Sequence, residues 1–195
     1  MKKITVVGAG YVGISLASLL AQNNQLTLLD IDPNKVDKIN NRLSPIKDPE
    51  VAKFLSSKNL DLIATTNKKK AYQDKDFIII ATPTNFDSKT NNFDTKTVEN
   101  VIDDILSINR NTNIIIKSTV PVGFTESQKK ITNFKNICFS PEFLREGNSI
   151  QDNINPSRII IGSTENFAKD FAKLLQQVSY NADVEIFYMS SDEAE

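Results

Sequence analysis

The chain has 195 residues, of which 39% are hydrophobic and 24% are charged, and its formal net charge is −1. This length and composition favour a folded globular domain over disorder. The small net charge gives no indication of nucleic acid or an anionic membrane surface as a partner. No apolar run approaches the roughly 20 residues that cross a bilayer, so no membrane association is expected.

The histidine and cysteine content restricts the chemistry. The chain has no histidine and a single cysteine, Cys138, which excludes an internal disulfide and makes a zinc site implausible, so no metal site is expected. Any proton transfer must then use a carboxylate, Lys, Tyr, Cys or water. Three glycines interrupt the apolar run in residues 1–22, which argues against a signal peptide and for a cytoplasmic protein.

The first part of the chain alternates strand-like and helix-like segments. Asp32 and Asp48 each precede a proline, the pattern of a helix N-cap followed by Pro at the first helical position. The segments predicted are strands at 2–8, 25–30 and 60–66, helices at 11–23, from Asp32 to about Arg42 and from Asp48, and a short basic helical turn after residue 66.

The second part continues this alternation. Strands are predicted at 76–84, 113–120, 136–143, 158–163 and 183–189, and helices at 93–108, capped by Asp94 or Thr95, at 125–134 and at 165–178. This order predicts one α/β domain over residues 1–195, with a doubly wound, mostly parallel sheet and helices on both faces. Ligands of such sheets bind beyond the carboxyl ends of the strands, which directs attention to residues 8–13, 30, 82–84, 118–120 and 140–146.

Residues 8–13 read Gly-Ala-Gly-Tyr-Val-Gly, a G-x-G-x-x-G pattern between a predicted strand and a predicted helix. Such a loop brings backbone amides and a helix N-terminus against a pyrophosphate. Asp30 ends the next strand 17 residues after Gly13, where a carboxylate can accept hydrogen bonds from ribose hydroxyls and would repel a 2′-phosphate, so NAD is predicted rather than NADP. Lys35, one helical turn further on, either reaches the adenosine ribose or is a surface lysine.

Two apolar strands end in hydroxyl residues and proline, in "IIIATPTN" and "IIIKSTVPVG". This places Thr82, Thr84, Ser118 and Thr119 at the expected ligand edge. Each is either a turn former or a group that orients a water or a substrate oxygen.

A third strand is followed by two carboxylates, Glu142 and Glu146, which flank Phe143-Leu144-Arg145. If this segment is one helical turn, the two carboxylates share a face and could act as a base through water. The alternative is an ordinary charged turn with Arg145 as its counter-ion.

Taken together, "GAGYVGISLA", "ATPTNFD…FDT", "KSTVPVG" and "SPEFLREG" resemble the N-terminal domain of the nucleotide-sugar dehydrogenase family, and "SPEFLREG" is similar to its UDP-glucose 6-dehydrogenase branch. The resemblance covers essentially the whole chain. It implies NAD-dependent oxidation of UDP-glucose to UDP-glucuronate, a polysaccharide precursor, by two hydride transfers. The family forms homo-oligomers.

The resemblance also implies roles for individual residues. Thr119 matches a threonine that positions the reacting water, and Glu142 matches a glutamate of proton transfer and thioester hydrolysis. The NAD-binding positions it implies are Gly8, Gly10, Tyr11, Val12, Gly13, Asp30, Lys35, Thr84, Thr119 and Glu146. The sugar-nucleotide positions it implies are Glu142, Phe143, Leu144, Arg145 and Glu146.

The family's nucleophilic cysteine lies in a later segment, and Cys138 does not match it; we interpret Cys138 as a core residue. The family's central helix and C-terminal sugar-nucleotide domain are also expected to be absent, so the 195 residues alone are expected to be inactive. Two alternatives remain open. One is a GDP-mannose or UDP-N-acetylmannosamine dehydrogenase, and the other is a non-catalytic NAD-binding module.

Overall fold

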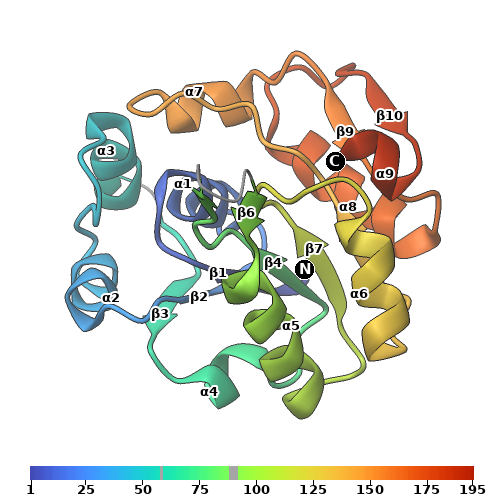
Figure 1. Ribbon diagram of the computed structural model, residues 1–195. Coiled ribbons are helices and arrows are strands. Elements are labelled where there is room, and N and C mark those ends of the chain that lie inside the picture. Colours follow the sequence, from blue (N-terminus) through green and yellow to red (C-terminus); the bar gives the residue numbers. More distant parts are fainter. Residues whose placement is uncertain (58, 88–91) are drawn as a thin grey trace.

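The computed structural model describes residues 1–57, 59–87 and 92–195. A six-stranded parallel sheet with the order β3-β2-β1-β4-β7-β8 runs through its centre (Figure 1). Its strands are β1 (Lys3–Val7), β2 (Gln25–Leu29), β3 (Leu62–Thr65), β4 (Phe77–Ile80), β7 (Asn113–Ile116) and β8 (Ile137–Phe139). The strand order reverses direction beside β1, and the predicted doubly wound α/β class is therefore confirmed.

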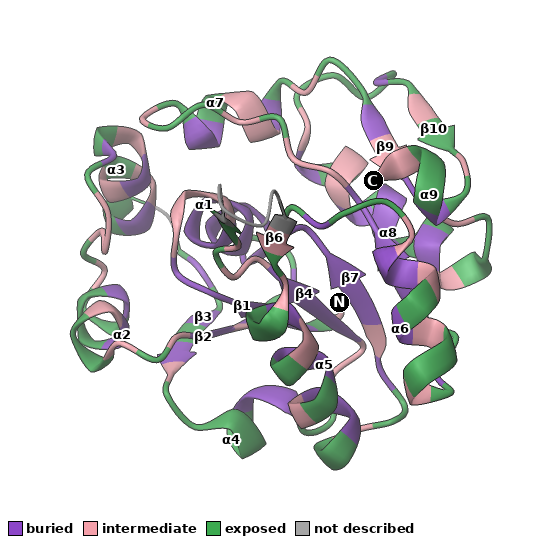
Figure 2. Ribbon diagram, viewed as in Figure 1, coloured by how far each residue is buried: buried purple, intermediate pink, exposed green. Residues whose placement is uncertain are grey.

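Helices cover both faces of this sheet. The bounds are α1 (Tyr11–Leu20), α2 (Pro33–Asn40), α3 (Pro49–Ser57), α4 (Lys68–Tyr72), α5 (Lys96–Ile108), α6 (Phe124–Thr132), α7 (Ser149–Ile154), α8 (Asn166–Val178) and α9 (Ser191–Ala194). One apolar core lies between the sheet and α1, α3, α7 and α8, and a second lies between the sheet and α4, α5 and α6. Figure 2 shows the strands buried between these layers. Burial on both faces explains the continuous isoleucine runs of β4 and β7.

Two further strands form a separate two-stranded sheet beside β8. β9 (Ile159–Ile161) pairs in parallel with β10 (Ile186–Tyr188). Gly162 N donates to Phe139 O at 2.8 Å, and Ser140 Oγ donates to Ile160 O at 2.9 Å, so β9 lies beside the end of β8. Elsewhere, β5 (Asn85–Asp87) and β6 (Asn92–Asp94) form an antiparallel hairpin.

The register of the parallel strands aligns their carboxyl ends. Val7 lies opposite both Leu29 and Ile80, Ile80 lies opposite Ile116, and Ile116 lies opposite Phe139. The segments that follow β1, β2, β4, β7 and β8 therefore meet at one edge, as the sequence predicts.

Most of the predicted elements are present, with shorter strands than expected. Asp32 and Asp48 accept hydrogen bonds from backbone amides in the first turns of α2 and α3, which confirms both N-caps. The helix expected from residue 93 begins at Lys96 because residues 92–94 pair with β5, and the Thr95 side chain bonds Glu99 instead of capping the helix. The hairpin, α7 and α9 were not predicted. Within the described residues, every helix is too short or too polar to cross a membrane.

Two glycines of the 8–13 loop are required by close packing. Gly8 has φ +103°, and a Cβ there would lie 2.6 Å from Ala81 O. A Cβ at Gly13 would overlap the carbonyl oxygen of Gly8. The start of α1 can therefore rest on the β1 turn only because both side chains are missing.

We expect Gly13→Ala to lower the free energy of unfolding by about 2–3 kcal/mol, the usual cost of overpacking a tight site. Gly10→Ala is the matched control, because Gly10 has an ordinary φ of −84° and a Cβ there meets no atom within 4 Å. Urea unfolding followed by circular dichroism measures both. Equal losses in the two variants would contradict this account of the contact.

Candidate functional site

The turn from β1 into α1 leaves a row of backbone amides open at the sheet edge. The first amides of a helix have no intrahelical partner, and Gly10, the N-cap of α1, has no side chain to accept from them. Space lies open around the missing Cβ of Gly10, unlike that of Gly8 or Gly13. Tyr11 and Val12 are partly exposed at this helix start. The loop therefore offers donors, a positive helix end and room for a diphosphate to approach.

Asp30 faces this loop from the end of β2. Its Oδ2 accepts from Ala9 N at 2.6 Å, and its Oδ1 accepts from Asp32 N at 2.9 Å. Two amides thus fix the carboxylate beside the glycine loop, where it can accept from the hydroxyls of a ribose. Lys35 Nζ lies 4.0 Å from Asp30 Oδ2, so this lysine lies near the carboxylate that we expect at the ribose.

The ends of β4 and β7 lie together on the other side of the loop. Ser118 Oγ donates to Thr82 O at 2.7 Å, so Ser118 ties the two strand ends together. Thr82 Oγ1 is buried and has no hydrogen-bond partner among the described residues. Thr84 is partly exposed and Thr119 is exposed, so both residues are accessible at this edge.

The segment after β8 is not the helical turn that we considered for residues 142–146. Residues 141–145 are extended or irregular and lead into a turn at 146–147. Arg145 pairs with neither glutamate: its backbone N and guanidinium bond Asp152 of α7, at 2.7 Å for Nη2 to Oδ1. The guanidinium of Arg145 holds the pKa of the Asp152 carboxyl below its usual range. Arg145 is thus bound to α7, and residues 141–145 are not helical. Glu142 and Glu146 therefore do not lie on one face of a helical turn.

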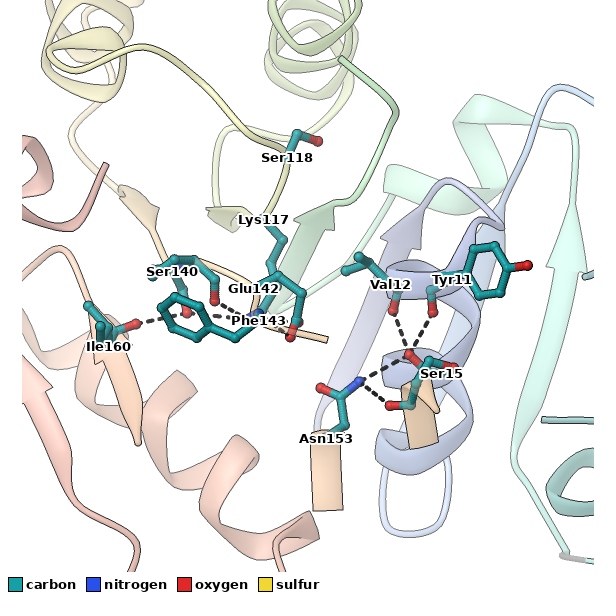
Figure 3. Close-up of polar contacts among 12 residues, drawn as sticks. Tyr11, Val12, Ser15, Lys117, Ser118, Ser140, Glu142, Phe143, Asn153 and Ile160 are labelled. Atoms are coloured by element: carbon teal, nitrogen blue, oxygen red, sulfur yellow. Dashed lines mark hydrogen bonds and ion pairs between the residues drawn. The ribbon is translucent and has the colours of Figure 1, made fainter. Parts of the chain in front are cut away.

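Glu142 turns inward to a buried lysine, as Figure 3 shows. Lys117 follows β7, and its side chain is 5% exposed. Its Nζ lies 3.5 Å from Glu142 Oε2, 3.2 Å from Pro141 O and 3.4 Å from Ser140 Oγ. Glu142 Oε2 is buried and accepts no hydrogen bond. The lysine charge thus compensates a carboxylate oxygen that the backbone does not satisfy.

A cavity of about 240 Å³ adjoins this ion pair. Lys117, Glu142 and Ser140 line it together with residues of α7 and α8. Asn153 of α7 also donates to Ser15 Oγ of α1 at 3.0 Å (Figure 3). α7 therefore connects the 140–147 segment to the helix of the glycine loop.

The other predicted sugar-nucleotide residues lie at the surface of this segment. Phe143 and Glu146 are exposed and Leu144 is partly exposed. The guanidinium of Arg158 lies 4.8 Å from the centre of the Phe143 ring. Phe143 lines the cavity beside Glu142, whereas Leu144, Arg145 and Glu146 do not.

Cys138 is a core residue, as the sequence suggests. It is fully buried in β8, and burial raises the pKa of its thiol to about 12. A neutral, inaccessible thiol is not a nucleophile.

Sequence reasoning missed Lys117, Asp152 and Asn153. Lys117 carries a signal that could have been used, because a lysine directly after a buried "NIII" strand needs a buried partner. Asp152 and Asn153 lie on a short helix without a clear apolar period, so no sequence pattern points to them.

The chain is similar in sequence to known proteins. The family profile described as "UDP-glucose/GDP-mannose dehydrogenase family, NAD binding domain" matches residues 2–179. A UDP-glucose 6-dehydrogenase of Campylobacter jejuni is 50% identical over 195 residues, which cover 99% of this chain and 50% of that protein. A UDP-glucose 6-dehydrogenase of Streptococcus pneumoniae is 42% identical over 199 residues, with the same coverage of 99% and 50%. The chain thus spans about half the length of these relatives.

Solved structures agree on the fold. A UDP-glucose dehydrogenase from Pyrobaculum islandicum has a TM-score of 0.85 and 25% identity, over 100% of this chain and 47% of that one. A GDP-mannose dehydrogenase from Pseudomonas aeruginosa also has a TM-score of 0.85 and 25% identity, over 98% and 47%. The open space at Gly10 and the carboxylate of Asp30 fit the diphosphate and ribose of the family's cofactor, NAD. The chain belongs to the UDP-glucose/GDP-mannose dehydrogenase family, of which it is the NAD-binding domain.

Proposed function

We propose that this chain is the NAD-binding part of an enzyme that oxidises UDP-glucose to UDP-glucuronate. The observation that carries the cofactor half of this proposal is the pairing of an open glycine loop with Asp30. A Cβ at Gly10 would meet no atom within 4 Å, and the Asp30 carboxylate is held beside the loop by Ala9 N. A carboxylate at the adenosine ribose favours NAD over NADP, because a 2′-phosphate would meet like charge.

The choice of UDP-glucose is supported by sequence rather than by fold. Relatives at 50% and 42% identity carry the name UDP-glucose 6-dehydrogenase. The fold matches a GDP-mannose dehydrogenase equally well, with the same TM-score of 0.85 as the archaeal UDP-glucose enzyme. Turnover by the complete natural gene product, with UDP-glucose, GDP-mannose and UDP-N-acetylmannosamine in parallel, decides the substrate.

NAD⁺ supplies the hydride acceptor when it is bound. In this proposal Glu142 accepts and returns protons at Oε2, the oxygen whose charge Lys117 compensates. Thr119 is exposed at the same sheet edge, where it contributes to NAD binding and orients a water or a substrate oxygen. Glu146 and residues 143–145 contribute to the sugar-nucleotide surface.

A covalent step on sulfur would need a thiol from outside these 195 residues, because Cys138 is buried and protonated. We therefore propose that the chain forms one NAD-binding domain, and that a further segment supplies the nucleophile and most of the sugar-nucleotide site.

For Asp30→Ala, we expect the Kd of NADH measured by calorimetry to rise about tenfold or more, because the ribose hydroxyls lose a charged acceptor. The parent chain should bind NADH more tightly than NADPH. Asp37→Ala is the control, since Asp37 is an exposed aspartate on α2. Equal affinity of the parent chain for the two cofactors would refute the role of Asp30.

Gly10→Val should weaken NADH binding by about tenfold or more while leaving the urea midpoint close to that of the parent chain. A side chain at this position enters the space that we assign to the diphosphate and touches no protein atom within 4 Å at its Cβ. Fluorescence titration with NADH measures the affinity. Undiminished binding would place the diphosphate elsewhere.

Mixed with UDP-glucose and NAD⁺, the 195-residue chain should form no NADH, because its one thiol is inaccessible. Iodoacetamide at pH 8 should leave Cys138 unlabelled in the folded chain and label it in urea, since about one thiol in ten thousand ionises when the pKa is near 12. Absorbance at the NADH band and mass spectrometry are the measurements. Steady turnover that survives Cys138→Ser would show that this account of the chemistry is wrong.

A further inference from the structure

The loop between β7 and α6, residues 117–123, is fixed at both ends by distant parts of the chain. At its start, Ser118 Oγ donates to Thr82 O at 2.7 Å. At its end, the side-chain carboxylate of Glu195 accepts from Gly123 N at 2.7 Å and from Thr125 N at 2.8 Å. Thr119 lies between these two anchors.

The first amides of α6 need an acceptor from elsewhere in the chain, because the N-cap residue of this helix offers no side-chain acceptor. Gly123 is the N-cap, adopts φ +88° and has no side chain to accept from the first helical amides. Each carboxylate oxygen of Glu195 accepts a hydrogen bond from one of these amides, which lie 72 and 70 residues away along the chain. An anion at this position also meets the positive end of the helix dipole.

Glu195 is itself held in place through α9. A capping box between Ser190 and Glu193 starts this helix. Ser191 is buried, and its Oγ donates to Gly162 O at 2.9 Å. A Cβ at Gly162 would lie 3.1 Å from Ala194 Cβ, so α9 packs tightly on the end of β9. The loop that carries Thr119 is therefore tied to the sheet through Glu195 and α9.

We propose that Glu195 is a positioning residue for cofactor binding, which it serves by holding Thr119 in place. The inference rests on the proposed NAD function. Gly10 follows β1 and Asp30 follows β2, where we place the diphosphate and the adenosine, whereas Thr119 follows β7 on the opposite side of β1. The nicotinamide half of a bound dinucleotide extends toward the β7 side. Loss of Glu195 should then weaken binding of the whole dinucleotide but not of ADP.

The experiment compares the 195-residue chain with Glu195→Ala, Glu195→Gln and Asp192→Ala. Asp192 is an exposed acid on α9, so its variant loses the same charge from the same helix. Amide exchange at Gly123 and Thr125 is read by NMR, and NADH and ADP affinities by calorimetry. In Glu195→Ala the two amides should exchange about fivefold to tenfold faster, as for a lost helix cap.

The affinity of Glu195→Ala for NADH should fall about threefold or more, with the ADP affinity within about twofold of the parent. Glu195→Gln keeps one amide oxygen as an acceptor and should lie between Glu195→Ala and the parent in both readouts. Asp192→Ala should match the parent.

Each other outcome is decisive. Unchanged exchange in Glu195→Ala, or faster exchange with an unchanged NADH-to-ADP affinity ratio, overturns the positioning role while leaving the proposed function intact. A parent chain that binds neither NADH nor ADP overturns the proposed function, and the positioning role with it.

Discussion

The contact between Gly13 and the carbonyl of Gly8 is the constraint on which the glycine loop depends. It sets the start of α1 against the end of β1, so that the uncapped first turn of the helix lies at the carboxyl edge of the sheet. The parallel register then brings the ends of β2, β4, β7 and β8 to the same edge. Backbone packing thus creates the binding surface before any charged side chain contributes. Asp30 adds to it a carboxylate that two amides already hold in position.

A buried charge organises the neighbouring part of the site. Lys117 lies almost completely inside the protein, and a lone buried ammonium would be costly. The turn after β8 compensates it with one carboxylate, one carbonyl and one hydroxyl. Because removal of either partner of such a pair leaves an uncompensated charge, Lys117 restrains Glu142 in the inward position. An extended path for residues 141–145 is what allows the carboxylate to reach the lysine.

A feature of the fold or the site could be predicted from the sequence when it depends on residues that are close along the chain, and not when its partners are distant. Local patterns sufficed for the glycine loop, for Asp32 and Asp48 as helix caps and for the isoleucine strands, because each depends on neighbouring residues. The same patterns also placed Asp30, Thr119 and Glu142 at the correct edge, since parallel strands align their ends. The helical turn considered for residues 142–146 did not form, because Arg145 pairs with Asp152 and Glu142 with Lys117. Neither partner is identifiable from local spacing.

Two of the elements that were not predicted, α7 and α9, hold the sheet edge from the second half of the chain. Ser149 of α7 donates to the buried cap Asp48, and Asn153 reaches Ser15 of α1. α9 does the same on the opposite face through Glu195. Both helices are short, with six and four residues, and isolated helices of that length are unstable in water. They are stable only where tertiary contacts hold them, so the order of the loops at the sheet edge depends on segments whose own helix propensity is weak. The S-x-x-E capping box at Ser190 is a local signal for α9, but the sequence of α7 carries no comparable pattern.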